Sequence, residues 1–173
     1  MAEVVHEPIA STDDDLPAVP ASAGALIFDH RGRLLILRPT YKPGWTIPGG
    51  VMENDGETPW QACQREVREE CGLEVTSARL ACVDFRPPRP GRSGGIRFLF
   101  DCGQLGSRAF QDMTVQPAEI AEHRLVPVAD ALALLRKPIR RRVRAAVRLD
   151  GRARRRGAVY LEDGRPVSAV SPA

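Results

Sequence analysis

Three glutamates on one predicted helix are the residues of this chain whose spacing is most suited to chemistry. Glu66, Glu69 and Glu70 stand at positions i, i+3 and i+4, so their side chains are neighbours on a helix surface and repel one another. Carboxylate oxygens clustered in this way suit Mg²⁺ or Mn²⁺, which also bind phosphate oxygens of substrates. An acidic face that is only solvated is the alternative interpretation of the same pattern.

The helix that carries these glutamates has clear boundaries in the sequence. Thr58 and Gln61 form a capping box, with Pro59 at the first helical position. Gly72 suits the left-handed residue that ends a helix. We therefore predict a helix over residues 59–71, with a buried stripe made of Trp60, Cys63, Val67 and Cys71.

A short strand, residues 45–48, precedes this helix and leads into Gly49 and Gly50. Paired glycines let a backbone pass close to a ligand or a metal, although a tight turn would explain them equally well. The polar loop that follows ends at Glu57.

Residues 50–73 together resemble the signature of the Nudix hydrolases, a MutT-like family. That signature is G-x5-E-x7-R-E-U-x-E-E-x-G-U, where U is apolar, and this chain has REVREECGL at the expected distance from Glu57. The one departure is that six residues, 51–56, separate Gly50 from Glu57 instead of five. We expect the extra residue to loop out within Asn54, Asp55 and Gly56, so that both anchors stay in register.

The resemblance implies a set of site residues. In the family manner the Gly49 carbonyl, Glu66, Glu69 and Glu70 would hold Mg²⁺, with Mn²⁺ as the alternative, while Gly50, Gly72 and an Arg65–Glu57 pair would support the site. The catalytic candidates are Glu66, Glu69 and one further acid, either Glu119 or Glu122. In the family manner this late acid would join the metal site or act as the base. Near the mouth we expect Arg38 to contact phosphate and Trp45 to stack on a base, with burial of Trp45 in the core as an equal alternative.

The activity implied by the resemblance is hydrolysis of the diphosphate linkage of a nucleoside diphosphate derivative. The alternative is a non-catalytic Nudix-fold module that binds a nucleotide, with a basic tail that contacts nucleic acid or a partner. The glutamates of the helix discriminate between the two alternatives. Nudix-fold proteins that bind a nucleotide without catalysis tend to lose these glutamates, and this chain retains them. We therefore favour an enzyme.

Strand patterns over residues 23–28, 34–37, 74–85, 96–102 and 119–126 alternate with helices over 59–71 and 128–135, which indicates a mixed α/β fold. The resemblance sharpens this expectation to an α/β/α sandwich with a mixed sheet between helices. We expect residues 103–118 to be irregular and residues 160–167 to form a hairpin. A flexible leader over residues 1–20 and a single domain over 21–173 complete the predicted organisation.

Composition excludes several classes of protein. The chain has 173 residues, 43% hydrophobic and 27% charged, which is ordinary for one soluble domain. No apolar run approaches a membrane span and the N-terminus lacks a signal-peptide pattern, so we expect a cytoplasmic protein without membrane contact. The four cysteines show no C-x-x-C pair and suit buried reduced thiols rather than zinc ligands.

Two basic segments complete the sequence. The tail, residues 136–156, holds eleven Lys or Arg and one acid, yet Ile139, Val143 and Ala146 form an apolar stripe. We therefore expect a docked helix with its arginines outside, and not nucleic acid as a main partner. The loop over residues 86–95 could close over an anionic substrate or only aid solubility. The oligomeric state stays open, with a homodimer among the alternatives.

Overall fold

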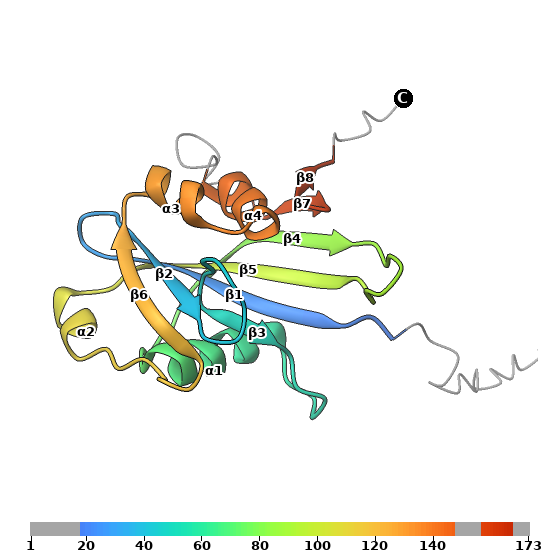
Figure 1. Ribbon diagram of the computed structural model, residues 1–173. Coiled ribbons are helices and arrows are strands. Elements are labelled where there is room, and N and C mark those ends of the chain that lie inside the picture. The colour runs from blue at the N-terminus through green and yellow to red at the C-terminus, as the bar shows by residue number, and fades with distance from the viewer. Residues whose placement is uncertain (1–17, 148–156, 168–173) are drawn as a thin grey trace, which may run out of the picture.

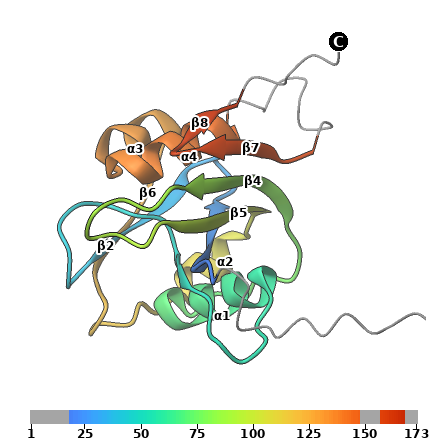
Figure 2. The same cartoon turned by 90° about the vertical axis from the view of Figure 1, so that its right-hand side faces the viewer.

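The computed structural model describes residues 18–147 and 157–167, and its elements form three layers. One mixed sheet lies in the middle. Helices α1 (Pro59–Cys71) and α2 (Ser107–Gln111) cover one face, and α3 (Val128–Leu134) and α4 (Lys137–Val147) cover the other (Figures 1 and 2). The predicted α/β/α sandwich with a mixed sheet between helices is therefore confirmed.

The sheet has the strand order β6-β2-β1-β5-β4-β7-β8, and β3 pairs with β1 outside this path. Two pairings, β1 with β5 and β4 with β7, are parallel, and the others are antiparallel. The strands are β1 (Ala21–Phe28), β2 (Leu34–Pro39), β3 (Gly49–Val51), β4 (Arg79–Arg86), β5 (Gly95–Gln104), β6 (Ile120–Val126), β7 (Val159–Glu162) and β8 (Arg165–Pro166).

Apolar side chains fill both faces of the central strands. On β1, Leu26 points to the α3/α4 layer, whereas Ala25 and Ile27 point to the α1 layer. Alternate residues of a strand face opposite sides, so one buried strand supplies two cores. The continuous apolar run of β2, in which Leu34 to Leu37 are all fully buried, has the same cause.

Three boundaries differ from the sequence expectations. Residues 103–118 are not wholly irregular, because β5 continues to Gln104 and α2 follows. Strand β4 begins at Arg79 and not at residue 74. Leu73 and Val75 alternate with exposed neighbours, which is a strand-like pattern. Within the described residues they pair with no strand, and they pack into the core instead. The regular strand before α1 is β3, whereas Trp45 and Thr46 form only isolated bridges.

Several predictions fall outside the described residues. The leader, except for Ala18 to Pro20, and the last part of the basic tail lie there. The C-terminal hairpin is present as β7 and β8, joined at Asp163 and Gly164. Within the described part, no helix combines the length and the apolar character that a membrane span requires.

Candidate active site

Helix α1 is fixed at both ends as its sequence predicts. The Gln61 amide donates to Thr58 Oγ1 at 3.3 Å, and the Thr58 amide donates to Gln61 Oε1 at 2.9 Å. Gly72 closes the helix with φ +63°. The buried stripe of Cys63, Val67 and Cys71 holds the helix against the sheet, with Trp60 packed on the Phe100 ring.

Strand β3 runs against the acidic side of α1. The backbone N–H of Gly49 donates to Glu70 Oε2 at 2.8 Å, and only 3% of Glu70 is exposed. A Cβ built on Gly50 would lie 2.2 Å from Glu66 Oε1, so only glycine permits this approach. The glycine pair thus does more than turn the chain, because it brings the backbone onto two glutamate carboxylates.

The surroundings of Glu66 and Glu70 disfavour the charged form of both carboxylates. Burial raises the pKa of Glu70 to about 7, against the opposing effect of the Gly49 N–H, and the charges of Glu66 and Glu119 raise it further. Burial also raises the pKa of Glu66, with Arg65 opposing the shift and Glu69 and Glu119 adding to it. Negative charge is therefore concentrated where a cation would relieve it.

Arg65 joins the loop to the helix. Its Nε donates to Glu57 Oε1 at 2.8 Å, and its Nη1 donates to Glu66 Oε1 and Glu69 Oε2, both at 3.0 Å. Its Nη2 donates to the Val51 carbonyl at 3.1 Å. The hydrogen bond from Arg65 lowers the pKa of Glu57, whose side chain is 8% exposed. This geometry matches the pairing that the resemblance implies.

The extra loop residue is accommodated without disturbing this pair. The Glu57 amide donates to Asp55 Oδ1 at 3.0 Å, and Gly56 has φ +90° and faces open space where a side chain would stand. The Glu53 amide donates to Glu57 Oε2 at 2.9 Å. Gly50 and Glu57 therefore keep the register expected of them.

The structure separates the two late acids. Glu119 immediately precedes β6, and its charge acts on both Glu66 and Glu70. Hydrogen bonds from Gln116 to the Glu70 carbonyl and from Thr40 to the Glu119 carbonyl hold this segment near the C-terminal part of α1. Glu122 instead pairs with Arg38 at 3.0 Å and Arg124 at 2.7 Å. Geometry thus favours Glu119 as the additional acid.

The donor chemistry of the cluster fits a hard divalent cation. Glu66, Glu70 and Glu119 carry carboxylate oxygens of the kind that such a cation prefers, and Glu70 has no arginine partner among the described residues. No three acidic, histidine or cysteine side chains of the described ranges are arranged around one point as a metal site would require. Glu69 bonds to Arg65. Cation binding by Glu69 therefore requires a change of its rotamer.

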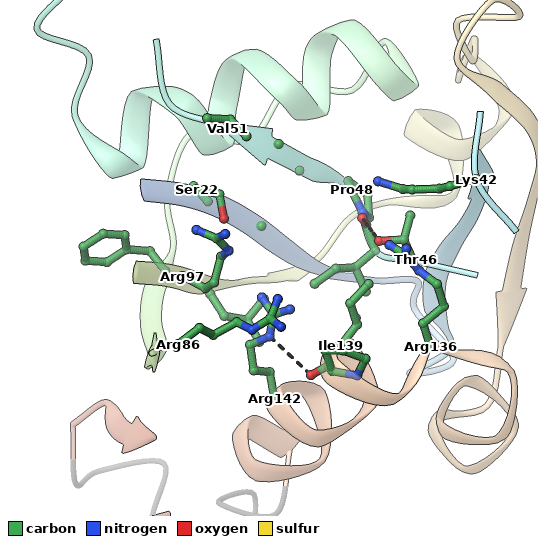
Figure 3. Close-up of a pocket in the computed structure, with 18 of the residues that line it drawn as sticks. Ser22, Lys42, Thr46, Pro48, Val51, Arg86, Arg97, Arg136, Ile139 and Arg142 are labelled. Atoms are coloured by element: carbon green, nitrogen blue, oxygen red, sulfur yellow. Dashed lines mark hydrogen bonds between the residues drawn. The ribbon is translucent and has the colours of Figure 1, made fainter. Parts of the chain in front are cut away.

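A cavity of about 670 Å³ lies on the other side of β3. Its walls come from β1, β3, β5 and the start of α4, together with the loop that carries Lys42 (Figure 3). The volume is within the range of small-molecule sites. The basic side chains that line it are Lys42, Arg86, Arg92, Arg97, Arg136 and Arg142.

A family model for the NUDIX domain matches residues 19–147. This chain belongs to the Nudix family. The match includes α1, β3, the carboxylate cluster and most of the cavity wall, so the site described above lies wholly within the Nudix domain.

Two curated relatives align with part of the chain. A MutT-like protein of Streptomyces ambofaciens is 34% identical over 102 residues, which are 59% of this chain and 62% of the relative. An RNA pyrophosphohydrolase of Hydrogenovibrio crunogenus is 42% identical over 60 residues, 34% of this chain and 35% of the relative. The chain thus spans less than two thirds of the length of either protein.

A solved structure, the MutT protein of Methanosarcina mazei Go1, has the same Nudix fold. It superimposes with a TM-score of 0.66 over 77% of this chain and 96% of that one, at 24% identity. At this identity the likeness concerns the fold.

Two residues expected near the substrate do not line the cavity of this Nudix domain. Trp45 is 8% exposed and packs in the core, with the Arg124 guanidinium 4.7 Å from its ring centre. Arg38 lies on β2 and pairs with Glu122. A substrate contact by either one stays a prediction, and the geometry favours the residues of the cavity wall.

The cavity residues that the sequence interpretation missed include arginines of β5, α4 and the residue before α4, namely Arg97, Arg142 and Arg136. The arginines of α4 do not all point outward, because Arg142 is 17% exposed and lies 3.5 Å from the buried Asp84. Arg142 flanks the apolar stripe at Val143, and that position beside the stripe was the available signal. The arginines of the 86–95 loop were noticed, and two of them, Arg86 and Arg92, do line the cavity.

Proposed function

We propose that this Nudix protein is a divalent-cation-dependent hydrolase that cleaves the diphosphate linkage of a nucleoside diphosphate derivative. The observation that carries the proposal is the position of β3. One side of β3 contacts the carboxylates of Glu66 and Glu70, and the other borders a cavity whose charged lining residues are all basic. A phosphate chain bound along β3 would therefore meet cationic side chains on one side and cation-binding carboxylates on the other.

The carboxylate side would supply the metal chemistry. Glu66, Glu69, Glu70 and the Gly49 carbonyl are the groups proposed to hold Mg²⁺, or alternatively Mn²⁺. A bound divalent ion neutralises phosphate oxygens and lowers the pKa of a water molecule. Clustered carboxylates whose pKa values are raised by burial and mutual repulsion support this assignment.

The remaining site residues would accept a proton or hold the loop in place. Glu119 is our candidate for the base, because its carboxylate is exposed and its charge acts on the cluster. Glu122 is the weaker candidate, since two arginines hold it. Arg65 and Glu57 would hold the loop against α1, and loss of such support costs about 10- to 100-fold in activity or metal affinity.

The alternative is a nucleotide-binding module without catalysis. The complete acidic set disfavours it, as do the names of related proteins, which include an RNA pyrophosphohydrolase and an 8-oxo-dGTP diphosphatase. That nucleic acid is not a main partner and that the location is cytoplasmic stay predictions, and a homodimer stays an open alternative.

A substrate screen tests the proposed function. The protein is incubated with Mg²⁺ and a panel of nucleoside diphosphate derivatives, and the products are resolved by anion-exchange chromatography. We expect at least one compound to yield two phosphate-terminated products, and excess EDTA to abolish the reaction. Tight binding of a compound without turnover, in Mg²⁺ and in Mn²⁺, would instead support the binding module.

A further inference from the structure

The cavity carries more positive charge than a single diphosphate requires. Among the residues that the structure describes, six basic side chains line it and no aspartate or glutamate does. Arg86, Arg97 and Arg142 gather at one end, and Lys42 and Arg136 lie at the other, near Pro48 and Thr46 (Figure 3). The two groups are carried by separate elements, so their convergence comes from the fold and not from one charged sequence run.

Few of these cations are neutralised by the protein. Arg142 pairs with Asp84, and Arg86 lies 4.0 Å from Asp163, a carboxylate that Arg89 and Arg141 also approach. The other four, Lys42, Arg92, Arg97 and Arg136, have no carboxylate oxygen within 4.0 Å in the ranges 18–147 and 157–167.

Hydrogen bonding is incomplete in the same place. The Nε atoms of Arg86 and Arg136 are buried and lack an acceptor within the described residues. Buried polar groups nearly always have a partner, so each exception calls for a specific cause, such as a bound ion or water. A third such atom, Arg79 Nη1, lies outside the cavity lining. Arg97 bonds only to backbone carbonyls, those of Pro20, Gly94 and Ile96.

The environment of the arginines also disfavours their charge. Burial lowers the pKa of Arg97, and repulsion from Arg86 lowers it further. Burial likewise lowers the pKa of Arg142, with Asp84 opposing the shift. A bound anion would remove this cost, which agrees with the missing carboxylates and acceptors.

We propose that the substrate carries a further phosphate group besides its scissile diphosphate, and that the cavity binds this group at the end where Arg86 and Arg97 gather. The inference rests on the proposed function for the position of the diphosphate at β3. The scissile diphosphate lies beside the carboxylates in that account, so it leaves most cavity cations without a counter-charge. An additional phosphate supplies both the charge and the acceptors.

Two kinds of compound have this chemistry. The additional phosphate can extend the polyphosphate chain, or it can be a phosphomonoester elsewhere on the nucleotide. Matched ligand pairs separate them. ADP and adenosine 5′-tetraphosphate differ in chain length, whereas ADP-ribose and its 2′-phosphate differ by one phosphomonoester.

Isothermal titration calorimetry of the full chain with these four ligands tests the proposal. The titrations are done in EDTA, which prevents turnover. All four ligands contain a diphosphate, so losing the cation beside it weakens both members of a pair alike. For at least one pair we expect the Kd of the more phosphorylated ligand to be lower by about tenfold or more. Each charge-assisted hydrogen bond of this kind lowers a Kd by about a factor of ten or more. Equal affinities within both pairs would overturn the proposal.

Two variants assign the preference to the cavity. Arg86→Met and Arg136→Met each remove one cation whose Nε lacks an acceptor among the described residues, and methionine keeps much of the side-chain length. Arg86→Met should reduce the preference several-fold, and Arg136→Met, at the other end of the cavity, should reduce it less. The matched control Arg144→Met removes the same charge from the exposed side of α4 and should leave it unchanged. Circular dichroism checks that each variant is folded.

The outcomes distinguish this inference from the proposed function. Hydrolysis without any preference for the added phosphate contradicts the inference alone. A preference that the two arginine variants reduce, in a protein that hydrolyses nothing, supports the inference and contradicts catalysis. A preference that Arg144→Met reduces as strongly as Arg86→Met indicates general electrostatic attraction and overturns the cavity assignment.

Discussion

The backbone N–H of Gly49 and the buried carboxylate of Glu70 form a 2.8 Å hydrogen bond that joins β3 to α1. This contact places a carboxylate directly behind the strand that borders the cavity. Glu66 and Glu119 act on the same carboxylate, so its charged form is stabilised by one amide and destabilised by burial and two acids. The arrangement has consequences for stability that can be measured without a substrate.

Stability in EDTA should fall as the pH rises from about 4.5 to about 7. Over this range folded Glu70, with its pKa raised from 4.5 to about 7, keeps a proton that the unfolded chain has lost. The folded state therefore binds more protons, and the free energy of unfolding decreases with pH, by a few kcal/mol at most. Urea titrations at several pH values in this range measure the free energy of unfolding. In Glu70→Gln the slope should be much smaller, and an unchanged slope would contradict the assignment.

Arg65→Ala should destabilise the fold by about 1–3 kcal/mol, because it leaves the nearly buried Glu57 carboxylate without its partner. Arg68→Ala is the matched control on the same helix. Arg68 pairs with Glu74 where both side chains are exposed, and such a surface pair contributes little to stability. Chemical denaturation compares the two variants. Equal losses would mean that the Arg65–Glu57 pair has no special structural role.

The two glycines of β3 should respond differently to alanine. In Gly50→Ala the new methyl group meets the end of the Glu66 side chain, which can move, so activity should fall by about tenfold or more with little loss of stability. In Gly49→Ala the methyl group meets the Ala23 carbonyl at 2.2 Å with φ at +139°, so the fold itself should be destabilised. Melting temperatures and turnover of both variants test this contrast. A Gly50→Ala protein as active as the parent would contradict the placing of Glu66.

Local patterns predicted α1 and its surroundings well. The capping box, the closing Gly72 and the Arg65–Glu57 pair depend on residues close in sequence, and each is present as expected. The burial of Glu70 could not be read from the helix alone. It depends on β3, which lies against α1 only because it pairs with β1.

The cavity depends on contacts between distant segments. Arg97 reaches it because β1 and β5 pair in parallel, and Arg142 reaches it because α4 docks over the sheet. Helical periodicity marks Val143 as buried but does not reveal that its neighbour Arg142 meets Asp84. For Trp45 the sequence left substrate contact and burial open as alternatives, and the structure buries it in the core.

Val143→Asp tests the docking of α4. Val143 is fully buried, so a carboxylate there would be an unpaired buried charge, and we expect a loss of several kcal/mol or failure to fold. Arg144→Asp, on the exposed side of the same helix, should change the free energy of unfolding by less than about 1 kcal/mol. Thermal unfolding monitored by circular dichroism compares the two. Similar stabilities would show that α4 does not pack as described.

The turnover number of Glu70→Gln at saturating Mg²⁺ tests the central claim most directly. Glutamine keeps the oxygen that accepts from Gly49 and removes a buried charge that two acids repel, so the variant should be at least as stable as the parent without metal. If the carboxylate holds a catalytic cation, turnover should fall by about 100-fold or more, because charge stabilisation of the transition state is lost. A Glu70→Gln protein with parental turnover would contradict the account and show that this carboxylate holds no catalytic cation.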